Sequence, residues 1–109
     1  MTSNLNIYLN DIVENLKANY NPEMIILFGS YCDGTFSEDS DIDLLIIKKT
    51  KKHPIWRRVE ARKASRARIP MDILVYTPSE LQNLKKAKSF FIMDILEKGK
   101  VLYEHGISK

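Results

Sequence analysis

The spacing of apolar side chains predicts one helix and four strands with little ambiguity. Over 4–18 the apolar positions recur with the 3.6-residue period of a helix, at Leu5, Leu9, Ile12, Val13 and Leu16. The unbroken apolar run 24–28 is typical of a strand covered on both faces. So is the segment 42–47, which is apolar on both faces once past Asp43. Two further strands are expected at 71–76 and 100–103, which gives a sheet of four strands.

Three more helices are predicted from their boundaries. The first follows Pro54, runs over 55–68 and carries only a thin apolar stripe, which we expect to be Ile55, Trp56 and Val59 with the alanines. The second begins after Thr77, whose spacing to Glu80 is that of a capping box, and ends near 86. The third spans 89–98 before Gly99. Tyr76, Phe90 and Phe91 are expected in the core.

This order of elements predicts an α/β (α+β) fold: a single small domain over 1–109, with a mixed β-sheet, flanking helices and a frayed tail at 104–109. The chain has 109 residues, 44% hydrophobic and 28% charged, enough for one core. Its longest apolar runs are about five residues, far short of the ~20 that cross a bilayer. Residues 1–10 carry no basic residue typical of a secretory signal, and Cys32 is the one cysteine. We expect a cytoplasmic protein without membrane contact.

Candidate chemistry lies where two predicted strands meet their loops. Gly29-Ser30 follows the first strand, and Asp41 and Asp43 stand at the start of the second. Side chains two apart in a strand share a face, so these carboxylates would lie side by side and attract a hard cation such as Mg²⁺. Asp72 is the acid of the third strand. If that strand neighbours the second, Asp72 completes a cluster of three carboxylates able to hold two ions.

The glycine and serine suit a different partner. A turn that leaves a buried strand exposes backbone N–H groups, Gly29 permits close approach, and Ser30 adds a hydroxyl donor, so the turn can hold a phosphate. A phosphate cradle beside a divalent-metal cluster is what nucleotidyl transfer needs, without a dedicated histidine base.

The pattern Gly29-Ser30-x10-Asp41-x-Asp43, followed by Asp72, resembles the nucleotidyltransferase superfamily that includes DNA polymerase beta. The short length resembles its smallest branch, the minimal nucleotidyltransferase (MNT) domains. The resemblance implies the nucleotidyltransferase fold, with Asp41, Asp43 and Asp72 as catalytic metal ligands for two Mg²⁺ ions. It implies that Gly29 and Ser30 bind the triphosphate of ATP. One feature departs from many members: the turn contains Asp33 where they place an arginine or lysine, and a cation from 48–68 can substitute.

The resemblance also implies a reaction and a partner. MNT domains are typically paired with a helical protein of the HEPN type, and the MNT protein acts as antitoxin by transferring AMP from ATP to a tyrosine of the toxin. Two alternatives stay open. One is a small-molecule, antibiotic-type transferase with a helical substrate-binding subunit, and the other is a catalytically silent binding module. The intact carboxylates and Gly-Ser turn favour an enzyme.

Charge is distributed unevenly and bears on the partner. Residues 48–68 contain ten Lys and Arg against Glu60, whereas 33–43 contains five acids and no base. In a helix, Arg58, Arg62 and Arg66 would form one exposed row, with Trp56 near its start. Such a row fits an acidic protein surface or RNA. We favour the protein, because a one-domain transferase needs its acceptor delivered by another molecule.

Overall fold

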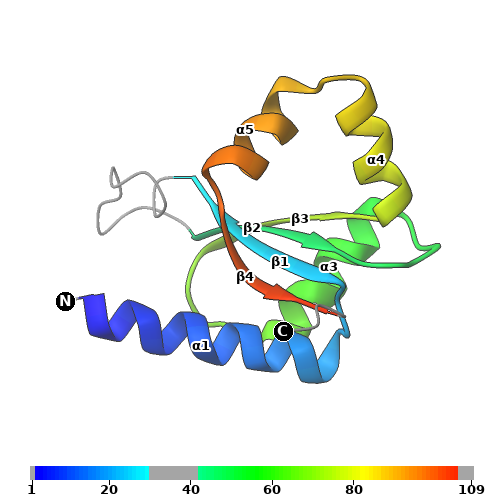
Figure 1. Ribbon diagram of the computed structural model, residues 1–109. Coiled ribbons are helices and arrows are strands. Elements are labelled where there is room, and N and C mark those ends of the chain that lie inside the picture. The colour runs from blue at the N-terminus through cyan, green and yellow to red at the C-terminus, as the bar shows by residue number, and fades with distance from the viewer. Residues whose placement is uncertain (1, 30–41, 106–109) are drawn as a thin grey trace.

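The computed structural model describes residues 2–29 and 42–105, with side chains from Tyr8 onward. Within these residues the chain forms four helices and four strands in the order that the sequence predicts (Figure 1). Their bounds are α1 Thr2–Asn19, β1 Met24–Phe28, β2 Ile42–Ile47, α3 Pro54–Ser65, β3 Met71–Tyr76, α4 Pro78–Lys86, α5 Phe90–Lys98 and β4 Lys100–Glu104. The predicted turn and loop between β1 and β2 lie outside the described residues.

The four strands form one mixed sheet in the order β3-β2-β1-β4. β2 and β3 are parallel and are connected through α3, whereas β1 is antiparallel to both β2 and β4. The β1–β4 pairing shifts its register between Ile25 and Ile26. The expected mixed sheet with flanking helices is therefore confirmed, and β3 directly neighbours β2.

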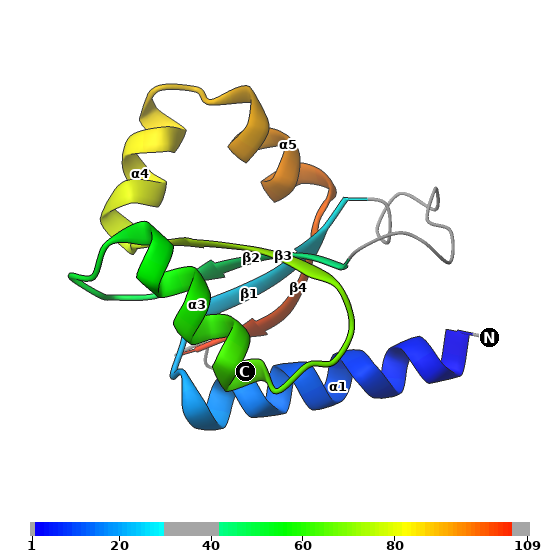
Figure 2. The same ribbon diagram turned by 180° about the vertical axis from the view of Figure 1, so that it is seen from behind.

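Two helices cover each face of the sheet (Figures 1 and 2). α1 and α3 pack on one face, where the alternate side chains Ile42, Leu44 and Ile46 of β2 enter the larger core cluster. α4 and α5 pack on the other, where Leu45 and Ile47 meet a second cluster with Leu81, Ile92 and Ile95. Both faces of β1 and β2 are buried, as their largely apolar sequences predict.

Several ends of elements follow from specific hydrogen bonds. Thr77 and Glu80 form the predicted capping box at the start of α4. α3 ends at Ser65 and not at Arg68, because Arg66 adopts a left-handed conformation with φ 54°. β4 runs through Glu104, which the sequence analysis assigned to a tail; the N–H of His105 then donates to the carbonyl of Glu23 at 2.8 Å.

Two expectations about packing are wrong. α3 buries Arg57, Ala61 and Ser65, whereas Ile55 and Trp56 are about 60% exposed. Small side chains at Ala61 and Ser65 let this helix lie close to its neighbours, so its large apolar residues face outward. Phe90 and Phe91 of α5 are 85% and 50% exposed and are not core residues. Of the helices that the structure describes, none is long and apolar enough to span a membrane.

Candidate active site

Two of the predicted site carboxylates meet at one end of the sheet. β2 and β3 run in parallel with Asp43 directly paired with Asp72. On the other side of β2, Asp43 is paired with Phe28, the last residue of β1. The starts of β2 and β3 and the end of β1 therefore meet at one end of the sheet, as the proposed carboxylate cluster requires.

Both carboxylates point to the face of the sheet that α4 and α5 cover. Residues two apart in a strand share a face, and Leu45 and Leu74, two residues after Asp43 and Asp72, belong to the cluster beneath α4 and α5. Asp43 is half-buried and Asp72 is exposed on the edge strand. The two side chains thus stand side by side with different access to solvent.

Gly29 is fitted closely against Asp43. It follows β1 with φ 80°, a conformation that L side chains rarely adopt. A Cβ at this position would overlap Asp43 Oδ2 and would lie 3.1 Å from its Cγ. The glycine is therefore required twice, by its backbone conformation and by the carboxylate that occupies the space of a side chain.

The donor set fits a hard divalent cation. Asp43 and Asp72 offer carboxylate oxygens from adjacent strands, which suits Mg²⁺. Among the described residues no group of three or more metal-ligating side chains occurs. Two of the predicted site residues, Ser30 and Asp41, lie outside the described part of the chain. Their roles as phosphate donor and metal ligand remain predictions.

A cavity of about 240 Å³ adjoins Gly29. Phe28 and Phe91 form part of its wall and make an edge-to-face contact with ring centroids 6.0 Å apart. The rest of the wall comes from α5 and its end, at Asp94, Ile95, Lys98 and Gly99. Sequence reasoning missed this cavity. The spacing of Phe91, Asp94, Ile95 and Lys98 predicts one helix face, but nothing in the sequence shows that this face meets Gly29.

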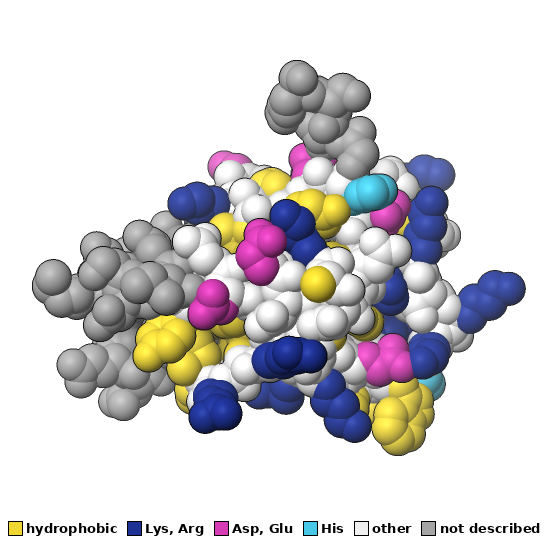
Figure 3. Space-filling model, turned by 90° about the horizontal axis from the view of Figure 1, so that it is seen from below, with side chains coloured by type: hydrophobic (Ala, Val, Ile, Leu, Met, Phe, Trp, Pro, Cys, Tyr) yellow, Lys and Arg dark blue, Asp and Glu magenta, His cyan; other side chains and the backbone are white. Residues whose placement is uncertain are grey.

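The basic segment 48–68 is less uniform than its sequence suggests. Seen from the side of α1 and α3, Lys and Arg side chains are interspersed with Asp and Glu (Figure 3). Lys52 pairs with Glu60, and Lys49 with Glu23 at 3.8 Å. Arg66 is the C-cap of α3, so the helix itself presents Arg58 and Arg62. Part of this charge therefore serves the fold.

Arg57 is the clearest structural cation. It is 6% exposed and forms a two-pronged contact with Glu80, at 2.7 Å and 3.3 Å. Its guanidinium also donates to the carbonyls of Lys52 and Val75. The hydrogen bond from Arg57 lowers the pKa of the Glu80 carboxyl below its usual value. This group connects α3, β3 and α4, and it takes no part in the candidate site.

Tyr20 supports the same helix from the end of α1. Its hydroxyl donates to the carbonyl of Arg57 at 3.1 Å. Lys48 donates to the carbonyl of Tyr20 and lies 4.4 Å from the centre of its ring. Burial, with the nearby charge of Glu60, raises the pKa of Tyr20 to about 12.

Comparison with known proteins agrees with this geometry. The family model described as "Polymerase beta, Nucleotidyltransferase" matches residues 10–107. The chain therefore belongs to the polymerase beta nucleotidyltransferase family and is a nucleotidyltransferase of the protein adenylyltransferase type. Two relatives from Methanocaldococcus jannaschii support this. "Putative protein adenylyltransferase MJ1305" is 31% identical over 92% of this chain and 72% of its own, and "Putative protein adenylyltransferase MJ0604" is 30% identical over 87% and 94%.

Solved structures show the same fold. A crystal structure from Sulfolobus solfataricus, named a "putative nucleotidyltransferase", superposes with a TM-score of 0.62 at 21% identity and covers 90% of this chain and 78% of its own. A toxin–antitoxin structure with AMP-PNP gives a TM-score of 0.57 at 25% identity, over 89% and 73% of the two chains. A tyrosine-to-alanine mutant of the toxin–antitoxin MntA-HpeT gives 0.58 at 26%, over 89% and 72%. The expected nucleotidyltransferase fold is confirmed.

Proposed function

We propose that this protein transfers AMP from ATP to a tyrosine hydroxyl of a helical, HEPN-type partner and acts as the antitoxin of that partner. In this assignment Asp43 and Asp72, together with Asp41, hold two Mg²⁺ ions. Gly29 and Ser30 hold the phosphates of ATP. When bound, Mg²⁺ supplies the positive charge that stabilises the triphosphate and the pyrophosphate leaving group.

The reaction is a single displacement at phosphorus. The acceptor oxygen forms a bond to the α-phosphorus of ATP, and the bond from that phosphorus to the oxygen bridging to the β-phosphorus breaks, so pyrophosphate leaves with the electron pair. The hydroxyl proton passes to a carboxylate oxygen of Asp72, which is exposed on the edge strand, and from there to solvent. Asp43, half-buried beside it, holds its carboxylate against Gly29.

The observation that carries the proposal is the pairing of Asp43 with Asp72 beside Gly29. This arrangement joins the carboxylates to the turn that the family uses for phosphate, on the end of the sheet where β1 stops. The cavity lined by Phe28 and Phe91 lies next to that turn, and we assign it to the nucleoside of ATP, because aromatic walls suit a flat base. The AMP-PNP of a structural neighbour is consistent with an ATP substrate.

The partner assignment is supported by the names of relatives. Two archaeal relatives are named protein adenylyltransferases, which points to a protein acceptor rather than an antibiotic. Two structural neighbours are toxin–antitoxin assemblies, and one of them carries a tyrosine replaced by alanine. A HEPN-type toxin with an acceptor tyrosine fits both observations.

The test is co-expression with the product of the adjacent gene, followed by intact-mass measurement with ATP and Mg²⁺. We expect the partner to gain the mass of adenylate with the wild-type protein. With the Asp43→Asn protein, the mass of the partner should stay unchanged. A stable complex without any mass gain would instead support a silent binding module. An absent complex with transfer to a small molecule would support the antibiotic-type enzyme.

A further inference from the structure

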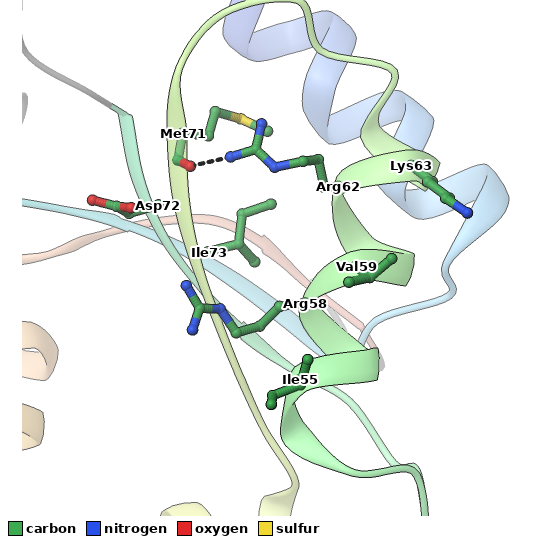
Figure 4. A pocket seen from close by; sticks show the side chains of 8 residues that line it. All are labelled: Ile55, Arg58, Val59, Arg62, Lys63, Met71, Asp72 and Ile73. Atoms are coloured by element: carbon green, nitrogen blue, oxygen red, sulfur yellow. Dashed lines mark hydrogen bonds between the residues drawn. The ribbon is translucent and has the colours of Figure 1, made fainter.

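A groove lies along the outer edge of β3, between this strand and α3 (Figure 4). Its volume is about 360 Å³. Ile55, Val59 and Ile73 contribute apolar surface, and Arg58, Arg62 and Lys63 contribute cations. Asp72 also lines the groove and is the one acid among its described lining residues. The groove therefore adjoins a carboxylate of the candidate site while being lined by positive charge.

Among the strands that the structure describes, none covers the outer edge of β3. The N–H of Ile42 donates to the carbonyl of Pro70, and that of Lys48 to the carbonyl of Tyr76, so even-numbered residues face β2. Because backbone groups alternate in a parallel pair, Met71, Ile73 and Val75 direct theirs away from the sheet. β3 is the last strand in the sheet order, so these groups face the groove side.

Arginines of α3 occupy two of these outward carbonyls. Arg62 donates to the carbonyl of Met71 and Arg57 to that of Val75 at 3.3 Å. Between them, no side chain of the described residues hydrogen-bonds to the backbone of Ile73. Ile73 is nevertheless only 3% exposed, so its backbone lies beneath the groove, and the accessible apolar surface of the groove comes from Ile55 and Val59.

The charges of the groove indicate which partner. Arg58 and Lys63 are exposed, and the structure gives neither of them an ion pair within its described residues. Their charge complements an acidic segment. The exposed apolar side chains of Ile55 and Val59 suit a peptide better than the sugar–phosphate chain of RNA.

The position of Asp72 explains why such a segment would be productive. Asp72 points away from α3, across β3, whereas Met71 and Ile73 point toward the helix (Figure 4). A segment in the groove must therefore send its hydroxyl around the edge of β3 to reach the carboxylate. A tyrosine is long enough for such a path, whereas a serine hydroxyl lies close to its own backbone.

We propose that this groove docks an acidic, extended segment of the acceptor protein alongside β3, with the acceptor tyrosine directed at Asp72. The inference rests on the proposed function for the role of Asp72, but the docking itself is a separate property of the groove. It assigns the selection of the acceptor to Arg58 and to the exposed apolar side chains of α3 that line the groove.

The docking is tested by NMR titration of the isotope-labelled protein with two short synthetic peptides. Each has one tyrosine, flanked by glutamates and valines in the first and by lysines and valines in the second. We expect the acidic peptide to shift the amide signals of Arg58, Val59 and Ile73. Arg58→Glu should weaken its binding by about tenfold. Arg68→Glu, the same charge change at an exposed residue outside the groove, should weaken it far less.

Several outcomes would overturn the docking proposal. They are equal binding of both peptides, equal losses in the Arg58 and Arg68 variants, no shifts at the groove, or shifts there with single-stranded RNA and not with the acidic peptide. The proposed function is tested separately by titrating the wild-type protein with ATP and Mg²⁺ and following the signal of Gly29. A protein that binds no ATP but docks the acidic peptide would disprove the enzyme assignment and leave the groove standing.

Discussion

Asp43 and Asp72 are direct neighbours across the parallel pair β2–β3, although 28 residues lie between them in the sequence. Two carboxylates this close repel each other, which costs folding free energy, and the fold nevertheless keeps both at one end of the sheet. Their shared face, beneath α4 and α5, also holds Phe28 and the turn at Gly29.

Asp43→Asn and Asp72→Asn should each reduce nucleotidyl transfer by at least about 100-fold, since each removes a charge that a bound metal requires. Thermal unfolding should stay near the wild-type midpoint or rise slightly, because one of two repelling carboxylates is gone. Transfer is measured by release of pyrophosphate, with Glu97→Gln, an exposed carboxylate of α5, as the matched control. Near-wild-type transfer in the Asp72 variant would show that Asp72 is not a ligand.

Gly29→Ala should destabilise the protein by about 1–3 kcal/mol, because it forces an L residue into a left-handed conformation and displaces the Asp43 carboxylate. Magnesium affinity should fall with it. In the double variant Gly29→Ala with Asp43→Ala, the carboxylate no longer occupies this space. Its loss of unfolding free energy, measured in urea, should therefore be smaller than the sum of the losses in the two single variants. Strictly additive losses would mean that the two groups do not compete for space.

Phe91→Ala should weaken ATP binding, because Phe91 forms a wall of the cavity beside Gly29. Phe90→Ala is the matched control: the neighbouring side chain is 85% exposed and lines no part of that cavity. Calorimetry with ATP and Mg²⁺ should show a loss of about 1–2 kcal/mol for Phe91 alone, the scale of one aromatic contact. Equal ATP affinities in the two variants would show that the nucleoside does not bind in this cavity.

Arg57→Met should destabilise the fold by about 3 kcal/mol, because it leaves Glu80 and two backbone carbonyls without their donor. The pH dependence has a definite sign. The pKa of Glu80 is lowered in the folded protein, so its contribution is present above the ordinary value of 4.5 and is lost as the pH falls through the folded value. Urea unfolding at a series of acidic pH values should show that the free energy of unfolding falls more steeply with decreasing pH for wild type than for Glu80→Gln.

Tyr20→Phe should cost about 1 kcal/mol, the net value of the hydrogen bond from its hydroxyl to the Arg57 carbonyl. The pKa of Tyr20 is raised from 10.0 to about 12 by burial, so the phenol ionises more easily in the unfolded chain. Its stabilisation is complete below pH 10 and is lost as the pH rises toward 12. Above pH 10, the free energy of unfolding should therefore fall less steeply with pH for Tyr20→Phe than for wild type.

The sequence predicted most of the fold because local signals and burial agree there. The apolar runs of β1 and β2 lie in a sheet covered on both faces, and Thr77 with Glu80 forms the expected capping box. The pairing of Asp43 with Asp72 was predicted only on the condition that β2 and β3 are neighbours, which no local pattern shows. The structure supplies that condition.

The errors share a physical cause. Arg57 stands among nine other basic residues of 48–68, and no sequence pattern shows that it reaches Glu80, 23 residues later. α3 instead packs through Ala61 and Ser65, so Ile55 and Trp56 face solvent. Phe90 and Phe91 lie outside the core for a similar reason: α5 buries Ile92 and Ile95 and leaves the preceding aromatics exposed. In each helix, tertiary contacts determine which side is buried.

The contact between Gly29 and Asp43 also limits how this chain can evolve. While the carboxylate is present, any side chain at position 29 meets it, so selection on the acid is at the same time selection on the glycine. A lineage that abandons catalysis and loses the carboxylate at position 43 removes one of the two constraints on position 29. Descendants that only bind their partner should therefore accumulate substitutions first at position 43 and then at position 29.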